Sequence, residues 1–158
     1  MAFSFQQSVG FKNKVAIQGD RANQNPTVYS VTNFLAGSGG VKVGTFVFLD
    51  TTYPESVVVN TGSSSHAVEG FVERVQNVNG FTFDPADMTI AEGGNVSVAR
   101  KGDFYVEADG AVSIGDTVYV NYTNGSVTFT SGSTTIDTGF KARSAAADSG
   151  DMVIISNW

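Results

Sequence analysis

Very few residues of this chain have the types and spacing that catalysis needs. His66 is the only histidine and the chain has no cysteine, so any Ser-His-Asp triad would have to use His66. The neighbouring serines, Ser63 to Ser65, are adjacent in sequence, whereas triad partners come from separate segments. The chain also has no Gly-x-Ser-x-Gly nucleophile elbow. We interpret His66 as a loop or strand-edge residue.

The segment from Ile136 to Gly139 reads Ile-Asp-Thr-Gly, and Asp-Thr-Gly after β-branched residues is the local signature of aspartic proteases. That chemistry needs two carboxylates that share a proton, so a second lobe or subunit must supply the other. The chain contains an internal repeat, in which residues 67–70 match this segment and have Val68 where that aspartate would stand. Phe140 also follows the glycine where those proteases usually carry a small residue. A homodimer could still pair two copies of Asp137. We interpret Asp137 as structural and predict that the protein is not an enzyme, with no catalytic residue.

Metal and cofactor sites are equally poorly supported by the residues present. The absence of cysteine excludes thiolate nucleophiles, zinc–cysteine sites and disulfides together. The acid pairs Asp84 with Asp87 and Asp148 with Asp151 could bind calcium, but neither matches an EF-hand loop. We interpret them as solvated turn carboxylates and predict no metal and no cofactor.

Composition and charge narrow the class of protein. The 158 residues fit one domain, and 18 glycines with only 15% charged residues indicate a turn-rich chain. The net charge is −6 and the nine Lys and Arg are scattered. We therefore do not expect nucleic acid as a partner. No apolar run approaches the roughly 20 residues that span a bilayer, and no basic region precedes an apolar stretch at the N-terminus. We expect a soluble protein made in a cytoplasm, with no membrane partner, that binds a protein surface.

The periodicity indicates strands. Short β-branched and aromatic segments, several with period-two alternation, are separated by Asn-Gly and Asp-Gly pairs that favour tight hairpin turns. The clearest hairpin runs from Tyr119 to Phe129. No long amphipathic helix is apparent. The predicted fold class is all-β: a small β-barrel or sandwich built from two similar β-units, with an N-terminal arm.

An internal repeat divides the predicted domain into halves. Gly44 to Asp50 matches Gly115 to Asn121, and Gly70 to Arg74 matches Gly139 to Arg143. An acid-and-glycine turn and a further strand follow each copy. A repeat of this length predicts one supersecondary unit used twice, over residues 41–100 and 112–158. Chance likeness between strand sequences is the alternative.

Residues 1–35 lie outside the repeat and form the predicted N-terminal arm and first strand, ahead of a single domain at 36–158. This segment contains phenylalanines that are less expected to be buried in the core of the domain. Aromatic residues are enriched at interface centres. We therefore expect partner contacts from its aromatic and basic residues, with the alternative that the aromatics fill the chain's own barrel. The candidates are Phe3, Phe5, Phe11, Lys12 and Lys14, with Phe34 as a further aromatic candidate.

Three patterns together suggest a family. They are the repeated Gly-x-x-Val-aromatic-x-Asp/Asn strand, the later Gly-Phe strand, and the run from Gly94 to Val106. They resemble the capsid cement, or decoration, proteins of tailed phages, and the likeness covers roughly residues 36–158.

The resemblance implies a compact β-barrel-like structural protein on the outside of a phage head, in the virion, typically as a homotrimer. The implied partners are the major capsid protein and other copies of the chain. The alternative is a receptor- or glycan-binding β-module of a tail fibre or adhesin. A binding module should present a groove with exposed aromatics, whereas a cement should present a contact surface at its base or on the arm.

Overall fold

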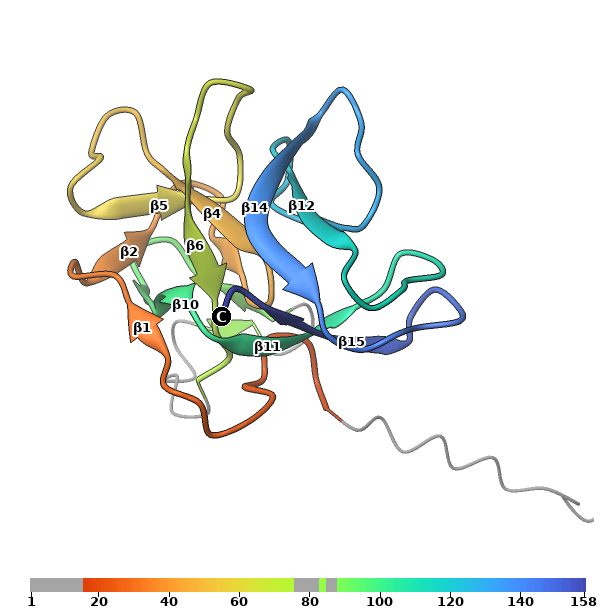
Figure 1. Cartoon of the computed structure of the whole chain (residues 1–158). Helices are drawn as coiled ribbons and strands as arrows, with labels where there is room; N and C mark the ends of the chain where they lie inside the picture. Colours follow the sequence, from red (N-terminus) through yellow and green to blue (C-terminus); the bar gives the residue numbers. More distant parts are fainter. Residues whose placement is uncertain (1–15, 76–82, 85–87) are drawn as a thin grey trace, which may run out of the picture.

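The computed structural model describes residues 16–75, 83–84 and 88–158, and within them every regular element is a β-strand. The predicted all-β class is therefore confirmed (Figure 1). In the same described residues, no helix is long and apolar enough to cross a membrane.

The largest sheet has seven strands and is built mainly from the first part of the chain. Its strands, in spatial order, are β1 (Val28–Tyr29), β10 (Val98–Lys101), β6 (Val68–Val72), β4 (Phe46–Leu49), β5 (Val57–Val59), β2 (Phe34–Ala36) and β9 (Asn95–Val96). All neighbours are antiparallel except β2 and β5, which pair in parallel. The two-residue strand β1 lies within residues 1–35, the segment predicted to contain the arm and the first strand.

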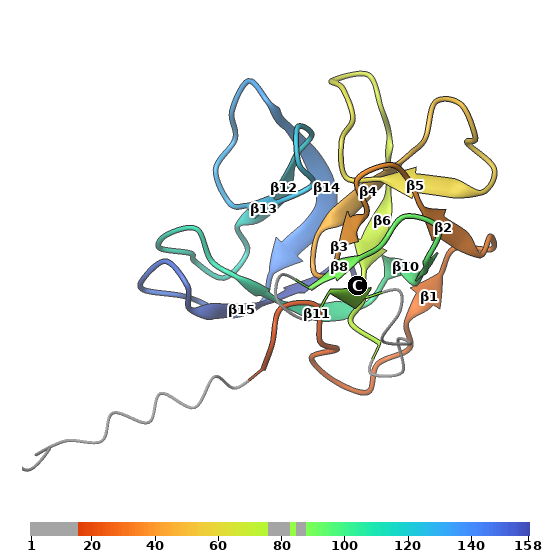
Figure 2. The ribbon, with the colours of Figure 1, turned by 180° about the vertical axis from the view of Figure 1, so that it is seen from behind.

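The second sheet has five strands and contains most of the chain beyond residue 102. In spatial order they are β11 (Asp103–Glu107), β15 (Met152–Ser156), β14 (Thr135–Ala142), β12 (Thr117–Asn121) and β13 (Val127–Thr128). The predicted hairpin is confirmed, because Tyr119 pairs with Thr128 and Val120 with Val127. A small third sheet contains β3 (Val41–Lys42), β8 (Thr89–Ile90) and β7 (Phe83–Asp84), and Figure 2 shows β3 and β8 on the side opposite to the view of Figure 1.

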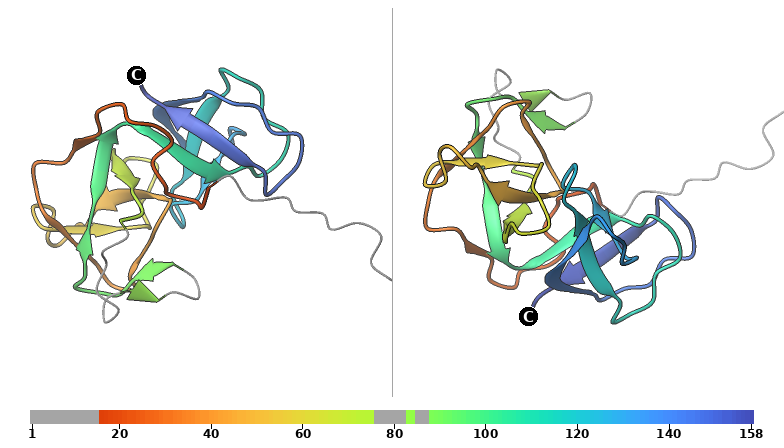
Figure 3. Two further views of the ribbon diagram at one scale, coloured as in Figure 1. Left: turned by 90° about the horizontal axis from the view of Figure 1, so that it is seen from below. Right: turned by 90° about the horizontal axis from the view of Figure 1, so that it is seen from above.

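The two larger sheets share a strand order. The series β10-β6-β4-β5 in one and β15-β14-β12-β13 in the other are each antiparallel throughout, and each second member pairs with the third through an irregular register. Figure 3 shows the two groups of strands side by side. The domain boundaries inferred from the repeat, at 1–35, 36–158, 41–100 and 112–158, stay predictions.

Two glycines at matching positions of the repeat precede the matching strands β4 and β12. Gly44 has φ +76° and precedes β4, and Gly115 has φ +95° and precedes β12. Their amides donate to the carbonyls of Val72 and Ala142, at 2.9 and 2.8 Å. A positive φ strains any residue with a Cβ, so the repeated glycine reflects the backbone turn that brings the chain into each strand.

The main core lies between the two larger sheets. Phe46 stands 5.2 Å from Phe71 and 5.4 Å from Phe140, ring centre to ring centre, and Phe71 stacks on Phe104 at 4.7 Å. All four rings are at most 2% exposed. Because two come from the first sheet and two from the second, the cluster joins the sheets. A second core, which includes Val47, Val58 and Val72, lies on the other side of the seven-stranded sheet.

The β12–β13 turn also joins the sheets. The amide of Phe46 donates to the carbonyl of Gly125 at 2.9 Å, and the amide of Gly62 donates to the carbonyl of Tyr122 at 2.6 Å. The hairpin of the second sheet is therefore hydrogen bonded to the start of β4 in the first.

Candidate functional site

The predicted partner-binding residues Phe3, Phe5, Phe11, Lys12 and Lys14 lie outside the described residues. What the structure describes is the segment that immediately follows them, together with the surface that this segment crosses. The described part of the candidate site is therefore its root in the body of the protein.

The segment from Ile17 to Asn25 runs along the outer strand of the five-stranded sheet. The amide of Gly19 donates to the carbonyl of Tyr105, and the amide of Tyr105 donates to the carbonyl of Asp20, at 2.8 and 2.9 Å. Arg21 forms an isolated bridge with Phe104. An unpaired strand edge exposes a row of backbone donors and acceptors, and this segment covers part of that row on β11.

The same segment is bonded to the seven-stranded sheet. The amide of Arg74 donates to the carbonyl of Gly19 at 2.8 Å, and the Arg74 guanidinium donates to Asp20 at 2.9 Å. The side-chain amide of Gln18 donates to the carbonyl of Gly44 at 2.8 Å. Residues 18–20 are therefore bonded on both sides, to β11 of the five-stranded sheet and to the segments that flank β4 and β6 of the seven-stranded sheet.

Asp103 forms one polar cluster under this segment. The side-chain amides of Asn23 and Asn25 each donate to Asp103 Oδ2 at 2.7 Å, and the residue is only 5% exposed. Desolvation acts to raise the pKa of this carboxyl, but hydrogen bonds from Ser156, Asn23 and Asn25 outweigh it, so the pKa lies below its ordinary value. The carboxylate thus fixes the segment to β11 in its charged form.

Glu73 forms the second cluster. This carboxylate is 7% exposed, accepts a short hydrogen bond from the Tyr29 hydroxyl, and forms an ion pair with Arg21 at 3.2 Å. Arg21 also donates to the Tyr29 hydroxyl at 2.8 Å. The carboxylate raises the pKa of the Arg21 guanidinium, while burial and then the bond to Glu73 raise the pKa of the Tyr29 hydroxyl. Arg21 therefore stays charged and Tyr29 stays neutral at neutral pH. We call Glu73, Tyr29 and Arg21 the latch.

Phe34 does not belong to the partner-contact set, contrary to the expectation from its position outside the repeat. It lies in β2, is 3% exposed, and packs in the second core. Its strand pairs with β5 and β9, which are distant in sequence. The alternative weighed for the aromatics, that they fill the chain's own core, is correct for this residue.

The described residues that suggested catalysis or calcium binding make local hydrogen bonds. Asp137 is exposed and accepts a hydrogen bond from the Gly139 amide at 2.8 Å, in the bulge of β14. His66 accepts a bond from the Ser63 amide through Nδ1 at 3.0 Å and lies against Phe48. Asp151 accepts a bond from the Asp148 amide at 3.2 Å. In the part of the chain that the structure describes, no three His, Asp or Glu residues gather as metal ligands.

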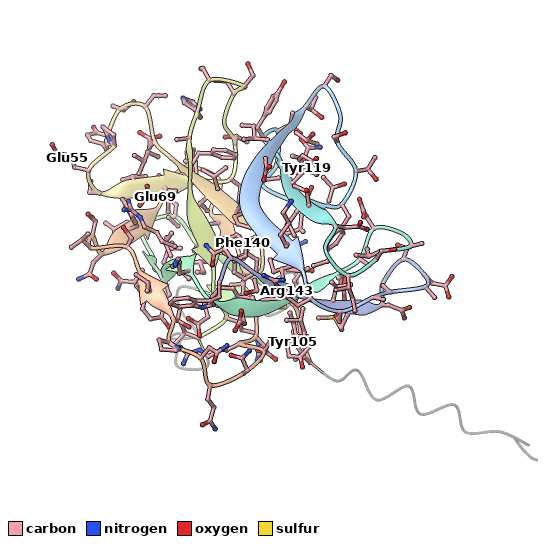
Figure 4. All side chains as sticks on the ribbon, viewed as in Figure 1. Glu55, Glu69, Tyr105, Tyr119, Phe140 and Arg143 are labelled. Atoms are coloured by element: carbon pink, nitrogen blue, oxygen red, sulfur yellow. The ribbon has the colours of Figure 1, made fainter. Side chains whose placement is uncertain are left out.

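A cleft of about 310 Å³ opens between β6 and β14. Phe46, Glu69, Gly70 and Phe140 are among its lining residues, and Figure 4 labels Glu69 and Phe140. The Glu69 side chain is 8% exposed, and one oxygen accepts bonds from Arg100 at 2.5 and 3.1 Å and from Ser30 at 3.0 Å. A carboxylate so compensated is suited to holding β6, β10 and the Ser30 segment together rather than to proton transfer. Sequence reasoning did not identify this pair, whose members are 31 residues apart.

Comparison with protein families gives a match over nearly the whole chain. Residues 5–157 match the family model described as "Structural cement protein (E217 gp24/Pam3 gp6)". The match includes the predicted contact residues Phe5, Phe11, Lys12 and Lys14. No curated protein matches the chain.

Comparison with solved structures shows the fold in a phage particle. A chain in the structure described as "The capsid of Myoviridae Phage XM1" aligns with a TM-score of 0.70. The alignment covers 98% of each chain at 15% sequence identity. At this identity the likeness shows a shared fold.

Proposed function

Because the chain belongs to the family of structural cement proteins, we propose that it binds the outer surface of a tailed-phage head, as a symmetric homotrimer, and stabilises the assembled shell. The observation that carries this proposal is the family match, which extends over residues 5–157 and so includes most of the arm. In this proposal the copies are made in the host cytoplasm and the major capsid protein is the partner. The alternative of a tail-fibre or adhesin module finds no support in the comparisons.

The physical basis of such a function is linkage. A protein that binds the assembled shell but not its separated subunits stabilises the shell by RT ln(1 + [L]/Kd) for each site. No chemistry is required, which agrees with the structural tasks of Asp137 and His66. A cement of this kind contributes contact area and the correct symmetry.

Residues 1–20 of the arm are the proposed foot. Phe3, Phe5 and Phe11 offer apolar anchors, and Lys12 and Lys14 place positive charge on a chain whose net charge is −6. The attachment of residues 18–20 to both sheets supports this role, because a force on the arm is then transmitted to the whole body. Three such feet on one trimer bind at high effective concentration once the first has bound.

Deletion of residues 2–14 tests the arm. We expect a folded trimer that no longer binds heads, because the deletion ends before Ile17, where the described contacts begin. The measurement is co-sedimentation with heads that lack the protein, with circular dichroism as the check of folding. A truncated protein that still saturates heads would refute the arm, and a monomer by analytical ultracentrifugation would refute the trimer.

A paired substitution gives a finer measure. Phe3→Ala with Phe5→Ala should weaken head binding about 30-fold or more, which corresponds to about 2 kcal/mol for hot-spot aromatics. Tyr53→Ala is the matched control, because Tyr53 is an aromatic residue of the body that is 64% exposed. Equal losses in the two variants would count against the arm as the foot.

A further inference from the structure

One corner of the molecule gathers basic and aromatic side chains on an otherwise acidic body. With Lys12 and Lys14 set aside, seven Lys and Arg face fifteen Asp and Glu in the sequence. Two of these seven, Lys101 and Arg143, contact Trp158, which is 49% exposed. We call Lys101, Arg143 and Trp158 the basic corner, and Figure 4 labels Arg143 within it.

The tryptophan of the basic corner is held in place. The Lys101 ammonium lies 4.2 Å from the centre of its ring, and Arg143 donates to its carbonyl at 2.8 Å. The preceding Asn157 donates to the carbonyl of Arg100 at 2.7 Å and accepts from the Gly102 amide at 3.1 Å. A half-exposed aromatic ring that is already ordered loses little entropy on binding and is therefore suited to be an interface anchor.

The opposite end of the second sheet has the complementary character. Ile114, which is 69% exposed, lies in the loop between β11 and β12. This loop is bridged to the β14–β15 loop through Val112 and Ala146. The acidic residues at this end are Glu107, Asp109, Asp116, Asp148 and Asp151, and residues 104–140 and 144–158 contain no Lys or Arg. We call Ile114 and these acids the acidic end.

The β11–β15 ladder separates the two surfaces. Asp103 pairs with Ser156 beside the basic corner, and Glu107 pairs with Met152 beside the acidic end. Figure 3 shows the C-terminus and the β14–β15 loop at different ends of these strands. The basic corner and the acidic end of the second sheet thus lie about 14 Å or more apart along the strands.

We propose that these two surfaces bind each other between copies of the chain, so that Trp158 of one copy packs against Ile114 of the next within the homotrimer. This inference rests on the proposed self-association and names its interface. An interface between two different surfaces is heterologous, and it closes into a ring when the rotation between neighbours permits. Opposite charges at the two ends orient copies that otherwise repel each other through their net negative charge.

Cysteine cross-linking tests the inference directly, because the chain has no cysteine of its own. The double variant Ile114→Cys with Trp158→Cys, oxidised on heads and in concentrated solution, should give covalent dimers and trimers on a non-reducing gel. The series of cross-linked products should stop at the trimer because the ring is closed. Each single variant should run as a monomer on the gel, since neither surface meets the same surface of another copy.

Tyr53→Cys with Trp158→Cys is the matched control pair, because Tyr53 is comparably exposed but lies outside both surfaces. This control variant should form no cross-linked dimer on the gel. A double variant that saturates heads without cross-linking would overturn the proposal, as would a single variant that forms dimers. If the native protein failed to bind heads, the proposed function would fall, while the cross-linking in solution would still decide the interface.

A charge exchange gives a second measurement. Lys101→Glu should weaken association at low salt, and addition of Asp148→Lys should restore it, since the two substitutions exchange opposite charges across the interface. Asp148 is exposed in the β14–β15 loop. Association that is unchanged by Lys101→Glu at low salt would contradict the proposed charge complementarity.

Discussion

Gly125 lies where the second sheet contacts the first, and its replacement by alanine should test that contact. The residue has φ +72°, and a Cβ placed on it would lie 2.4 Å from the carbonyl oxygen of Phe46 and 2.6 Å from the side-chain nitrogen of Asn60. The positive φ alone costs an alanine about 1–2 kcal/mol. Because the first clash is with backbone that is itself hydrogen bonded, relief requires the β12–β13 turn to move away from β4.

We therefore expect Gly125→Ala to lower the free energy of unfolding by about 3 kcal/mol or more, the backbone cost plus a similar cost for the displaced turn. This loss corresponds to a fall in Tm of roughly 6–12 °C for a domain of this size. Urea unfolding at one fixed protein concentration is the suitable measurement, because self-association would make stability concentration-dependent.

Gly139→Ala is the matched control for this prediction. Gly139 has φ +78°, yet a Cβ on it would meet nothing within 4 Å. Gly139→Ala should therefore lower the free energy of unfolding only by the backbone cost of about 1–2 kcal/mol. If the two variants lost equal stability, the turn would not be a tight contact between the sheets and the reasoning would be refuted.

Two further predictions concern the root of the arm. Tyr29→Phe removes a hydroxyl donor from the 7%-exposed Glu73 and should destabilise the fold by about 1–2 kcal/mol; a thermal melt unchanged from the native protein would show that the latch adds nothing. The pKa of Asp103 is lowered in the folded protein, so its stabilisation is present above the unfolded pKa of about 3.9 and is lost as the pH falls through the lower folded value. Asp103→Asn should therefore weaken the dependence of unfolding on pH below about pH 4, whereas Asp137→Asn, at an exposed carboxyl, serves as the comparison. Equal pH profiles for native protein and Asp103→Asn would contradict this account.

Local patterns in the sequence predicted the strands and the hairpin well. Alternating β-branched and aromatic residues, with Asn124-Gly125 between them, fix a hairpin through interactions among near neighbours. Gly44 and Gly115 were recognised as a repeated signal, and both have the positive φ that only glycine adopts without strain. These features depend on a few adjacent residues, which is why a single sequence is enough to find them.

Long-range contacts could not be predicted in the same way. The position of Phe34 outside the repeat wrongly predicts a partner contact, because its burial depends on pairing between β2 and strands that lie far along the chain. The segment around Gly19 has no periodic pattern, since it is held by bonds to Tyr105 and Arg74 rather than by strand pairing of its own. The buried acid Glu73 gave no signal either, because its partner Arg21 is 52 residues away.

The double attachment of Gly19 has a mechanical consequence. A pull on the arm reaches the backbone bonds to Tyr105 and Arg74 together, and the ion pair between Asp20 and Arg74 carries load in parallel with them. Bonds loaded in parallel must break at nearly the same moment, whereas a strand edge peeled from one end yields one bond at a time. If the arm binds a shell as proposed, tension from that shell is divided between the two sheets at Gly19, and the body resists it as a single unit.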